Sequence, residues 1–205
     1  MRRAIVTMGS GPYEELLSIS GPRMKAYADK HGYEYVELTD LDPVRPPSWL
    51  KVLPLADMLE TYDALFWLGC DVLILDDSKD IADQIAPTAW QALTAHHTGE
   101  GEIPNCDVWY LRPEMADYLR QAWAMEQYAT HPWWEQKAIL DLMGYRGSPL
   151  QAENPTDLYR HTHFLPLELN SHESNDRAQN PIFAHATYGD LQWRLGVFRR
   201  YLEAL

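Results

Sequence analysis

The first forty residues show a strand–helix–strand pattern, which restricts the fold more than any other feature of the chain. Residues 4–8 form a short apolar run that stops at a Gly-Ser-Gly-Pro loop. Residues 13–30 carry apolar side chains at helical spacing, interrupted at Gly21-Pro22, and residues 33–38 alternate as a half-buried strand does. Because the crossover between neighbouring strands is almost always right-handed, these two strands are expected to be parallel. We therefore predict an α/β fold with a mostly parallel central sheet flanked by helices.

A third strand signal follows a helix predicted over residues 49–62. Residues 64–68, Ala-Leu-Phe-Trp-Leu, are the most apolar strand of the chain, and Asp71 comes just past them. In open α/β sheets the ligand crevice lies outside the carboxyl ends of the strands. Asp71 is therefore expected to face a ligand site.

The pattern beyond residue 80 is less regular. Helices are predicted over residues 114–128, 133–143 and 191–202, and strands over 108–111 and 182–185. Residues 81–85 and 89–93 fit a helix or a strand. Residues 148–180 are rich in polar residues and proline, so they are predicted to form a loop that is either functional or disordered.

Length, charge and cysteine content exclude several classes of protein. A chain of 205 residues suits one domain, residues 1–205. The net charge of −13 repels phosphate backbones, so nucleic acid is an unlikely partner. Two cysteines without CxxC spacing fit a reducing compartment, and no signal peptide or run of about 18 apolar residues is found. We expect a cytoplasmic protein without a transmembrane segment.

The position of Asp71 suits metal-assisted chemistry. Departure of a diphosphate is assisted by a divalent cation, and Mg²⁺ or Mn²⁺ is usually held by one or two carboxylates together with phosphate oxygens and water. Asp71 could equally begin a turn with Asp76-Asp77. The residues alone do not decide between these interpretations.

Several segments, taken in order, resemble the GT-A glycosyltransferases, in particular the galactosyl- and mannosyltransferase-like family related to fungal Golgi enzymes. They are similar to that family's Trp-x-Lys helix, DxD strand, Asn-x-Gly strand, Trp-x-Glu-Gln helix and closing Asn-Ser and His segments, at residues 48–59, 62–74, 105–112, 131–139, 165–171 and 182–189. The resemblance implies one Rossmann-like GT-A domain, with a nucleotide-binding half (1–80) and a sugar- and acceptor-binding half (81–205). It also implies a hexosyltransferase that moves a sugar from a nucleotide-diphosphate sugar to a hydroxyl acceptor with retention of configuration.

The resemblance also assigns residue roles. Asp71 and His185 would hold Mg²⁺ or Mn²⁺; catalytic roles would fall to Asp107, Glu135 and Gln136, and substrate binding to Lys51, Asn105, Trp134 and Asn170. Two positions depart from the family: Gly69 stands in place of the first DxD aspartate, and Asp107 stands where the family commonly has glycine. The cation would then rest on Asp71, His185 and diphosphate oxygens.

Two rival interpretations stay open. The first is a non-catalytic module that binds a nucleotide or a glycan and has a degenerate DxD site. The second is a metallohydrolase built on His161 and His163, with His172, Glu168 and Asp176 nearby. Glu135 also has a local explanation, because an acidic residue at the start of a helix is favoured by the helix dipole.

Overall fold

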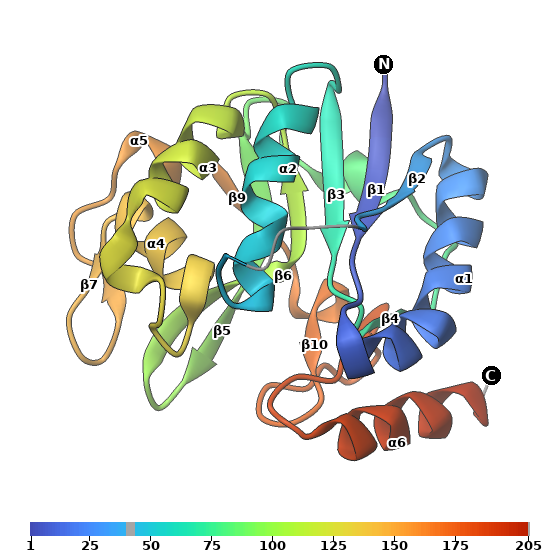
Figure 1. The fold of residues 1–205 in the computed structure, drawn as a ribbon. Coiled ribbons are helices and arrows are strands. Elements are labelled where there is room, and N and C mark those ends of the chain that lie inside the picture. The colour runs from blue at the N-terminus through green and yellow to red at the C-terminus, as the bar shows by residue number, and fades with distance from the viewer. Residues whose placement is uncertain (40–43, 205) are drawn as a thin grey trace.

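The computed structural model describes residues 1–39 and 44–204 and places a six-stranded sheet at the centre (Figure 1). The strand order is β2-β1-β3-β6-β5-β9. Within the described residues, β6 is the strand that runs against the other members of this sheet. The predicted α/β class with a mostly parallel, helix-flanked sheet is confirmed.

The strand–helix–strand prediction at the amino terminus is confirmed. Strands β1 (Arg3–Thr7) and β2 (Glu34–Glu37) are parallel neighbours, joined by helix α1 (Glu14–His31). The helix continues through Pro22, where an interruption was predicted, and it ends at Gly32, whose φ of 72° is left-handed. Strand β3 (Ala64–Leu68) pairs parallel with the other side of β1.

Side chains alternate between two cores along the central strands. On β1, Ala4 and Val6 pack toward helices α2 (Val52–Met58), α3 (Met115–Ala124) and α4 (Trp134–Met143), while Ile5 packs toward α1. Strand β3 divides in the same way, with Leu65 and Trp67 on one face and Phe66 on the other. Because successive side chains point to opposite faces of the sheet, each short strand contributes apolar residues to the cores on both sides.

The helix predicted over residues 49–62 is shorter than expected. Residues Pro47–Lys51 form a 3-10 turn, and the α-helix covers only Val52–Met58. Pro54 accounts for the late start of the α-helix, because it has no N–H to donate to the carbonyl of Leu50. The 3-10 turn sets the direction of Lys51 relative to the sheet.

A long hairpin replaces the ambiguous region after residue 85. Residues 81–85 contain a 3-10 turn (Ile81–Gln84), and residues 89–93 lead into strand β5 (Gln91–Thr98), which pairs with β6 (Gly101–Leu111). Strand β6 begins well before residue 108, the predicted start, because cross-strand pairing overrides the weak strand propensity of its polar first half. Since β6 is antiparallel to β3, its middle lies at the carboxyl end of β3.

A second, smaller sheet lies at the carboxyl edge of the central sheet. It contains β10 (Ser171–His172), β11 (Phe183–His185) and β4 (Val72–Ile74), which directly follows Asp71. Helix α6 (Leu191–Leu202), predicted correctly, lies along the same end of the molecule (Figure 1). The turn between β3 and β4 is therefore where the two sheets meet.

The polar segment 148–180, predicted to be one functional or disordered loop, has regular structure. It contains short elements, namely β8 (Gln151–Ala152), α5 (Asp157–Arg160), β9 (Thr162–Phe164), a 3-10 turn (Leu167–Leu169) and β10. Strand β9 joins the central sheet parallel to β5, and β8 pairs with β7 (Tyr145–Arg146). Further 3-10 turns cover Gly11–Tyr13 and Glu126–Tyr128. None of the described helices is long and apolar enough to cross a membrane.

A buried histidine pair joins the two sheets. His96 of β5 stacks on His172 of β10 with ring centroids 3.4 Å apart, and His96 Nδ1 lies 3.0 Å from Asp176 Oδ2. Burial lowers the pKa of His96 to about 4 despite the carboxylate, and burial likewise lowers the pKa of His172. Both rings are therefore neutral in the folded protein near pH 6.

We expect the free energy of unfolding to fall as the pH drops from 6.5 to 4. The unfolded histidines take up protons below about 6.5, whereas folded His96 stays neutral down to about 4, so the unfolded state binds more protons. The loss due to His96 should reach about 2–3 kcal/mol. Urea titrations at a series of pH values measure it. A His96→Gln variant that keeps the full pH dependence would contradict this origin.

Candidate active site

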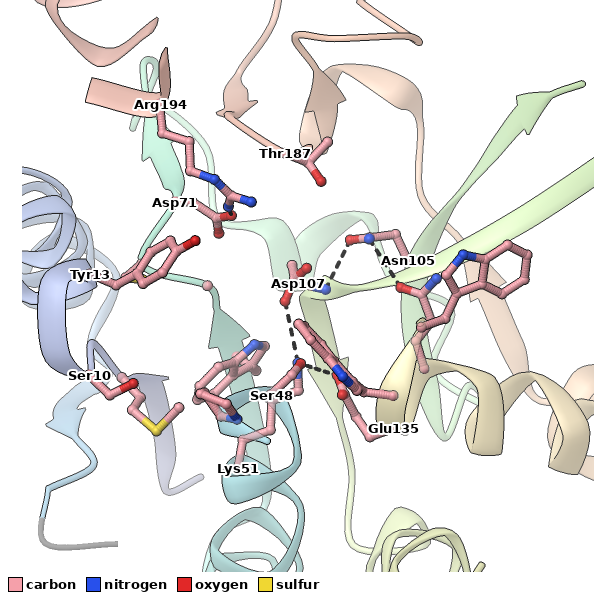
Figure 2. Close-up of a pocket in the computed structure, with 18 of the residues that line it drawn as sticks. Ser10, Tyr13, Ser48, Lys51, Asp71, Asn105, Asp107, Glu135, Thr187 and Arg194 are labelled. Carbon is pink, nitrogen blue, oxygen red and sulfur yellow. Dashed lines mark hydrogen bonds and ion pairs between the residues drawn. The ribbon is translucent and has the colours of Figure 1, made fainter. Parts of the chain in front are cut away.

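A cavity of about 610 Å³ opens at the carboxyl ends of β1 and β3. Its walls come from distant parts of the chain: the loop after β1, the 3-10 turn at 47–51, the β3–β4 turn, the middle of β6, the start of α4, the loop after β11, and α6 (Figure 2). Of the predicted site residues, Lys51, Asp71, Asn105, Asp107, Trp134, Glu135 and Gln136 line it. His185 and Asn170 lie buried behind Asp71 and Asn105.

The carboxylates of Asp71 and Asp107 lie next to Gly69. The Gly69 N–H donates to the Asp107 carbonyl at 2.8 Å, which holds β6 against the end of β3. A Cβ atom on residue 69 would lie 2.8 Å from Asp71 Oδ1 and 3.4 Å from Asp107 Oδ1. The space of a side chain at 69 is thus already filled by the Asp71 and Asp107 carboxylates.

Asp71 contacts two basic side chains. Its Oδ2 accepts a hydrogen bond from Arg194 Nη1 and lies 3.4 Å from His185 Nε2, and the Asp71 side chain is only 13% exposed. Burial alone would raise the pKa of Asp71, but His185 and Arg194 outweigh it and hold the pKa below its usual range. Asp71 is therefore an anionic anchor inside the cavity wall.

A chain of amides orients His185. Gln136 Oε1 accepts from Asn105 Nδ2 at 3.1 Å, and Asn105 Oδ1 accepts from Asn170 Nδ2 at 3.0 Å. This leaves Asn170 Oδ1 to accept from His185 Nδ1 at 2.9 Å. The buried His185 Nε2 has no hydrogen-bond partner among the described residues, and it lies 3.4 Å from Asp71 Oδ2 and 3.7 Å from Asp107 Oδ2.

The donor set at Asp71 does not fit a self-contained divalent cation site. His185 Nε2 is a suitable nitrogen ligand, but position 69 supplies no carboxylate, and the Asp71 carboxylate is already paired with a guanidinium. A divalent ion on the same carboxylate would be repelled by Arg194, since like unit charges near a protein surface cost about 4 kcal/mol at about 4 Å. Within the described part of the chain, no group of three His, Cys, Asp or Glu residues is arranged to hold a metal.

Lys51 is a buried cation between two carboxylates. Its Nζ lies 2.8 Å from Glu135 Oε1 and 3.3 Å from Asp107 Oδ1, and it donates to the Cys106 carbonyl at 3.3 Å (Figure 2). Burial opposes the charged form, but Glu135 and Asp107 outweigh it and raise the pKa of Lys51. All three N–H donors of Lys51 thus have protein acceptors, so its geometry suits positioning of the carboxylates rather than contact with phosphate.

Two exposed aromatic residues with strained backbones stand at the cavity. Trp134 (φ 42°) and Tyr188 (φ 69°) are the non-glycine residues with positive φ in the described chain, and both line the cavity. Their exposed fractions are 41% and 62%. A left-handed conformation is unfavourable for such residues, and backbone strain of this kind clusters at functional sites.

Residues of this site that the sequence interpretation missed include Tyr13, Thr187, Tyr188 and Arg194. Arg194 could have been recognised from its place in the first turn of a helix. The helix dipole disfavours a positive charge there, so a negatively charged partner is expected nearby. The loop of residues 8–11 does line the cavity, as expected of a loop after the first strand.

The histidines behind the metallohydrolase interpretation do not form one cluster. His161 stacks on Trp90 with ring centroids 3.9 Å apart, and His172 stacks on His96. The described residues contain no three-ligand group that would support this rival.

No protein-family model and no curated protein sequence matches the chain. Solved structures do match over nearly its whole length. A glycosyltransferase involved in the glycosylation of the major capsid of PBCV-1 aligns with a TM-score of 0.71 and 14% identity, covering 98% of this chain and 100% of that one. The galactosyltransferase LgtC, solved in complex with donor and acceptor sugar analogues, aligns with a TM-score of 0.60 and 10% identity, covering 98% and 96%.

The chain has the GT-A glycosyltransferase fold. The glycosyltransferase GlyE of Streptococcus pneumoniae also shares it, with a TM-score of 0.65 and 12% identity over 98% of this chain and 60% of that one. At these identities the likeness concerns the GT-A fold itself, and the resemblance to the fungal Golgi family is not confirmed.

Proposed function

We propose that this protein transfers a hexosyl group from a nucleotide-diphosphate sugar to a hydroxyl group of a glycan. The observation that supports this most is the cavity at the carboxyl edge of a GT-A sheet, where Asp71, Asp107 and Glu135 meet two cations and two exposed aromatic rings. In the reaction, the bond between the anomeric carbon and the diphosphate oxygen breaks, and its electron pair leaves with the diphosphate. A bond from the acceptor oxygen forms, and the hydroxyl proton is released.

The two halves of the chain would bind different parts of the donor. Residues 1–80 supply the loop at 8–13, which suits the nucleotide base, and Asp71 beside the diphosphate. Residues 81–205 supply Asn105, Asp107, Glu135 and Gln136 for the sugar and the acceptor. Asp107 is the most exposed of the three carboxylates, at 32% of its side chain, and is the candidate to accept the hydroxyl proton.

Other predicted roles follow from the contacts. Lys51 would position Asp107 and Glu135, and Asn170 would position His185 and Asn105. Retention of configuration stays a prediction. The assignment of Mg²⁺ or Mn²⁺ to Asp71 and His185 is untested, and the Arg194 guanidinium on Asp71 argues against it.

A panel of sugar nucleotides tests the proposed function. Thermal shift should reveal binding, because a ligand at 100 times its dissociation constant adds about 2.7 kcal/mol of stability. Release of UDP or GDP in the presence of oligosaccharide acceptors should then reveal transfer, and NMR of the product gives its anomeric configuration. Absence of binding by every sugar nucleotide, with and without Mn²⁺, would contradict the proposal.

One observation favours a second candidate, a binding module without catalysis: position 69 lacks the first carboxylate of the DxD pair. The same panel separates the two. Binding of a sugar nucleotide without release of a nucleoside diphosphate, with any acceptor tried, would favour the module.

We expect the strained backbone of Trp134 to place its exposed ring where a sugar can stack on it. Trp134→Gly should be more stable than Trp134→Ala by about 1 kcal/mol, because only glycine adopts the left-handed conformation without cost. Both variants should bind an acceptor oligosaccharide about tenfold more weakly than the native chain, for loss of an aromatic face. Thermal denaturation and titration calorimetry measure these effects. Equal stability of the two variants would mean that the backbone at 134 is not strained.

A further inference from the structure

Arg194 lies against Asp71 although it comes from the opposite end of the chain. It stands in the first turn of α6; its Nη1 donates to Asp71 Oδ2, and its Nε donates to the Gly189 carbonyl at 2.9 Å. Its side chain is 16% exposed and forms part of the cavity wall (Figure 2). The guanidinium is therefore held at two points, and one of them is the carboxylate of the degenerate DxD motif.

The start of α6 is built to hold this position. Asp190 Oδ1 caps the helix by accepting from Trp193 N at 2.8 Å, and the buried Phe198 anchors the helix against the protein. A Cβ on Gly189 would lie 2.1 Å from the Trp193 ring, so glycine is required for the close approach that presents its carbonyl to Arg194. The guanidinium is thus set in place before any ligand binds.

Donor groups of Arg194 are left for a ligand. Nε and Nη1 bond to protein, whereas Nη2 has no protein acceptor within residues 1–39 and 44–204. The guanidinium carbon lies 5.4 Å from the centre of the Tyr13 ring, in the wall between the nucleotide-side loop and Asp71. A planar fork of N–H groups is suited to bidentate binding of phosphate oxygens.

We propose that Arg194 binds the diphosphate of the donor and supplies the positive charge that a divalent cation supplies at a complete DxD site. This rests on the proposed glycosyl transfer. When the bond from the anomeric carbon breaks, its electron pair stays on the diphosphate oxygen, and Arg194 stabilises the negative charge that develops there. Position 69 has no carboxylate with which to hold a cation, and the Arg194 guanidinium on Asp71 provides the positive charge instead.

Titration calorimetry with UDP, GDP, ADP and dTDP tests the proposal, in EDTA and in Mn²⁺. The tightest-binding diphosphate should bind the native protein with the same affinity in both buffers. Arg194→Ala should weaken it at least about tenfold in EDTA, because charge-assisted hydrogen bonds are lost. Arg194→Lys should be intermediate, since it keeps the charge but not the fork. The matched control is Arg200→Ala, which removes one positive charge from an exposed position of the same helix.

The outcomes separate this proposal from the proposed function. If the native protein binds a diphosphate only with Mn²⁺, or if Arg194→Ala binds as Arg200→Ala does, the role of Arg194 is wrong while sugar-nucleotide binding stands. If no diphosphate binds the native protein in either buffer, the proposed function falls together with it. Thermal denaturation of each variant shows that the compared proteins are folded.

Discussion

Asp71→Ala should lower the rate of nucleoside diphosphate release at least about 100-fold, the scale seen when one preorganised electrostatic contact to a transition state is removed. Asp71 holds the Arg194 guanidinium and faces the buried His185 Nε2. Without the carboxylate, Arg194 loses one of its two side-chain hydrogen bonds within the described chain, and His185 Nε2 loses the anion that it faces. Steady-state turnover of the best sugar nucleotide, with a thermal denaturation check, measures the effect.

The control for this variant is Asp76→Ala. Asp76 lies just beyond β4 and accepts a hydrogen bond from the Ser78 N–H, but it does not line the cavity. Its loss removes the same charge from a nearby position, so turnover should stay near the native rate. Native turnover by Asp71→Ala would show that the chemistry takes place elsewhere.

Lys51→Met should destabilise the fold by about 3–5 kcal/mol, as expected when one partner of a buried ion pair is removed. The Lys51 and Glu135 side chains are 1% and 3% exposed, so the remaining Glu135 charge would be buried without its closest cation. Urea denaturation of the variant measures the loss. A loss of about 3–5 kcal/mol is a large part of the free energy of unfolding of a typical domain.

Two comparisons identify the cause of that loss. Lys25→Met removes a lysine whose partner Asp29 is 67% exposed, and it should cost less than about 1 kcal/mol. The double variant Lys51→Met/Glu135→Leu should recover much of the stability, because a buried pair replaced by apolar groups is often neutral. It should still lack turnover, since Asp107 would lose its lysine contact. A double variant as unstable as the single one would contradict the charge explanation.

The parts of the fold that follow from local pattern could be predicted from the sequence. The opening strand, helix and strand, the apolar strand 64–68 and helix 191–202 all carry their periodicity in consecutive residues. Asp71 could be placed at a sheet edge because it directly follows the most apolar strand. The resemblance grouped His185 with Asp71, and the structure brings them together because β11 pairs antiparallel with β4, with His185 opposite Val72.

Non-local pairing could not be predicted in this way. The polar start of β6 and all of β9 become strands because β5 lies between them and pairs with both. The local pattern of residues 101–107 and 162–164 does not indicate this strand pairing. The left-handed backbone of Trp134 likewise has no signal in the sequence, since tryptophan does not favour it.

The position of Arg194 was missed for a different reason. The distance in sequence between Arg194 and Asp71 leaves no spacing pattern to recognise, and the helix around it looks like an ordinary amphipathic closing helix. What marks the residue is a positive charge at the unfavourable end of a helix. The missing carboxylate at Gly69 was visible in the sequence, whereas the guanidinium beside Asp71 was visible only in the structure.

A crystal structure of the protein with a bound sugar nucleotide would test the proposed donor site directly. We expect the base at the loop of residues 8–13, the diphosphate beside Arg194 and Asp71, and the sugar directed toward Asp107 and Gln136. A donor bound in this cavity with its diphosphate on Arg194 would support both proposals. A sugar nucleotide bound outside the cavity, or one turned so that its sugar points away from Asp107, would contradict the account.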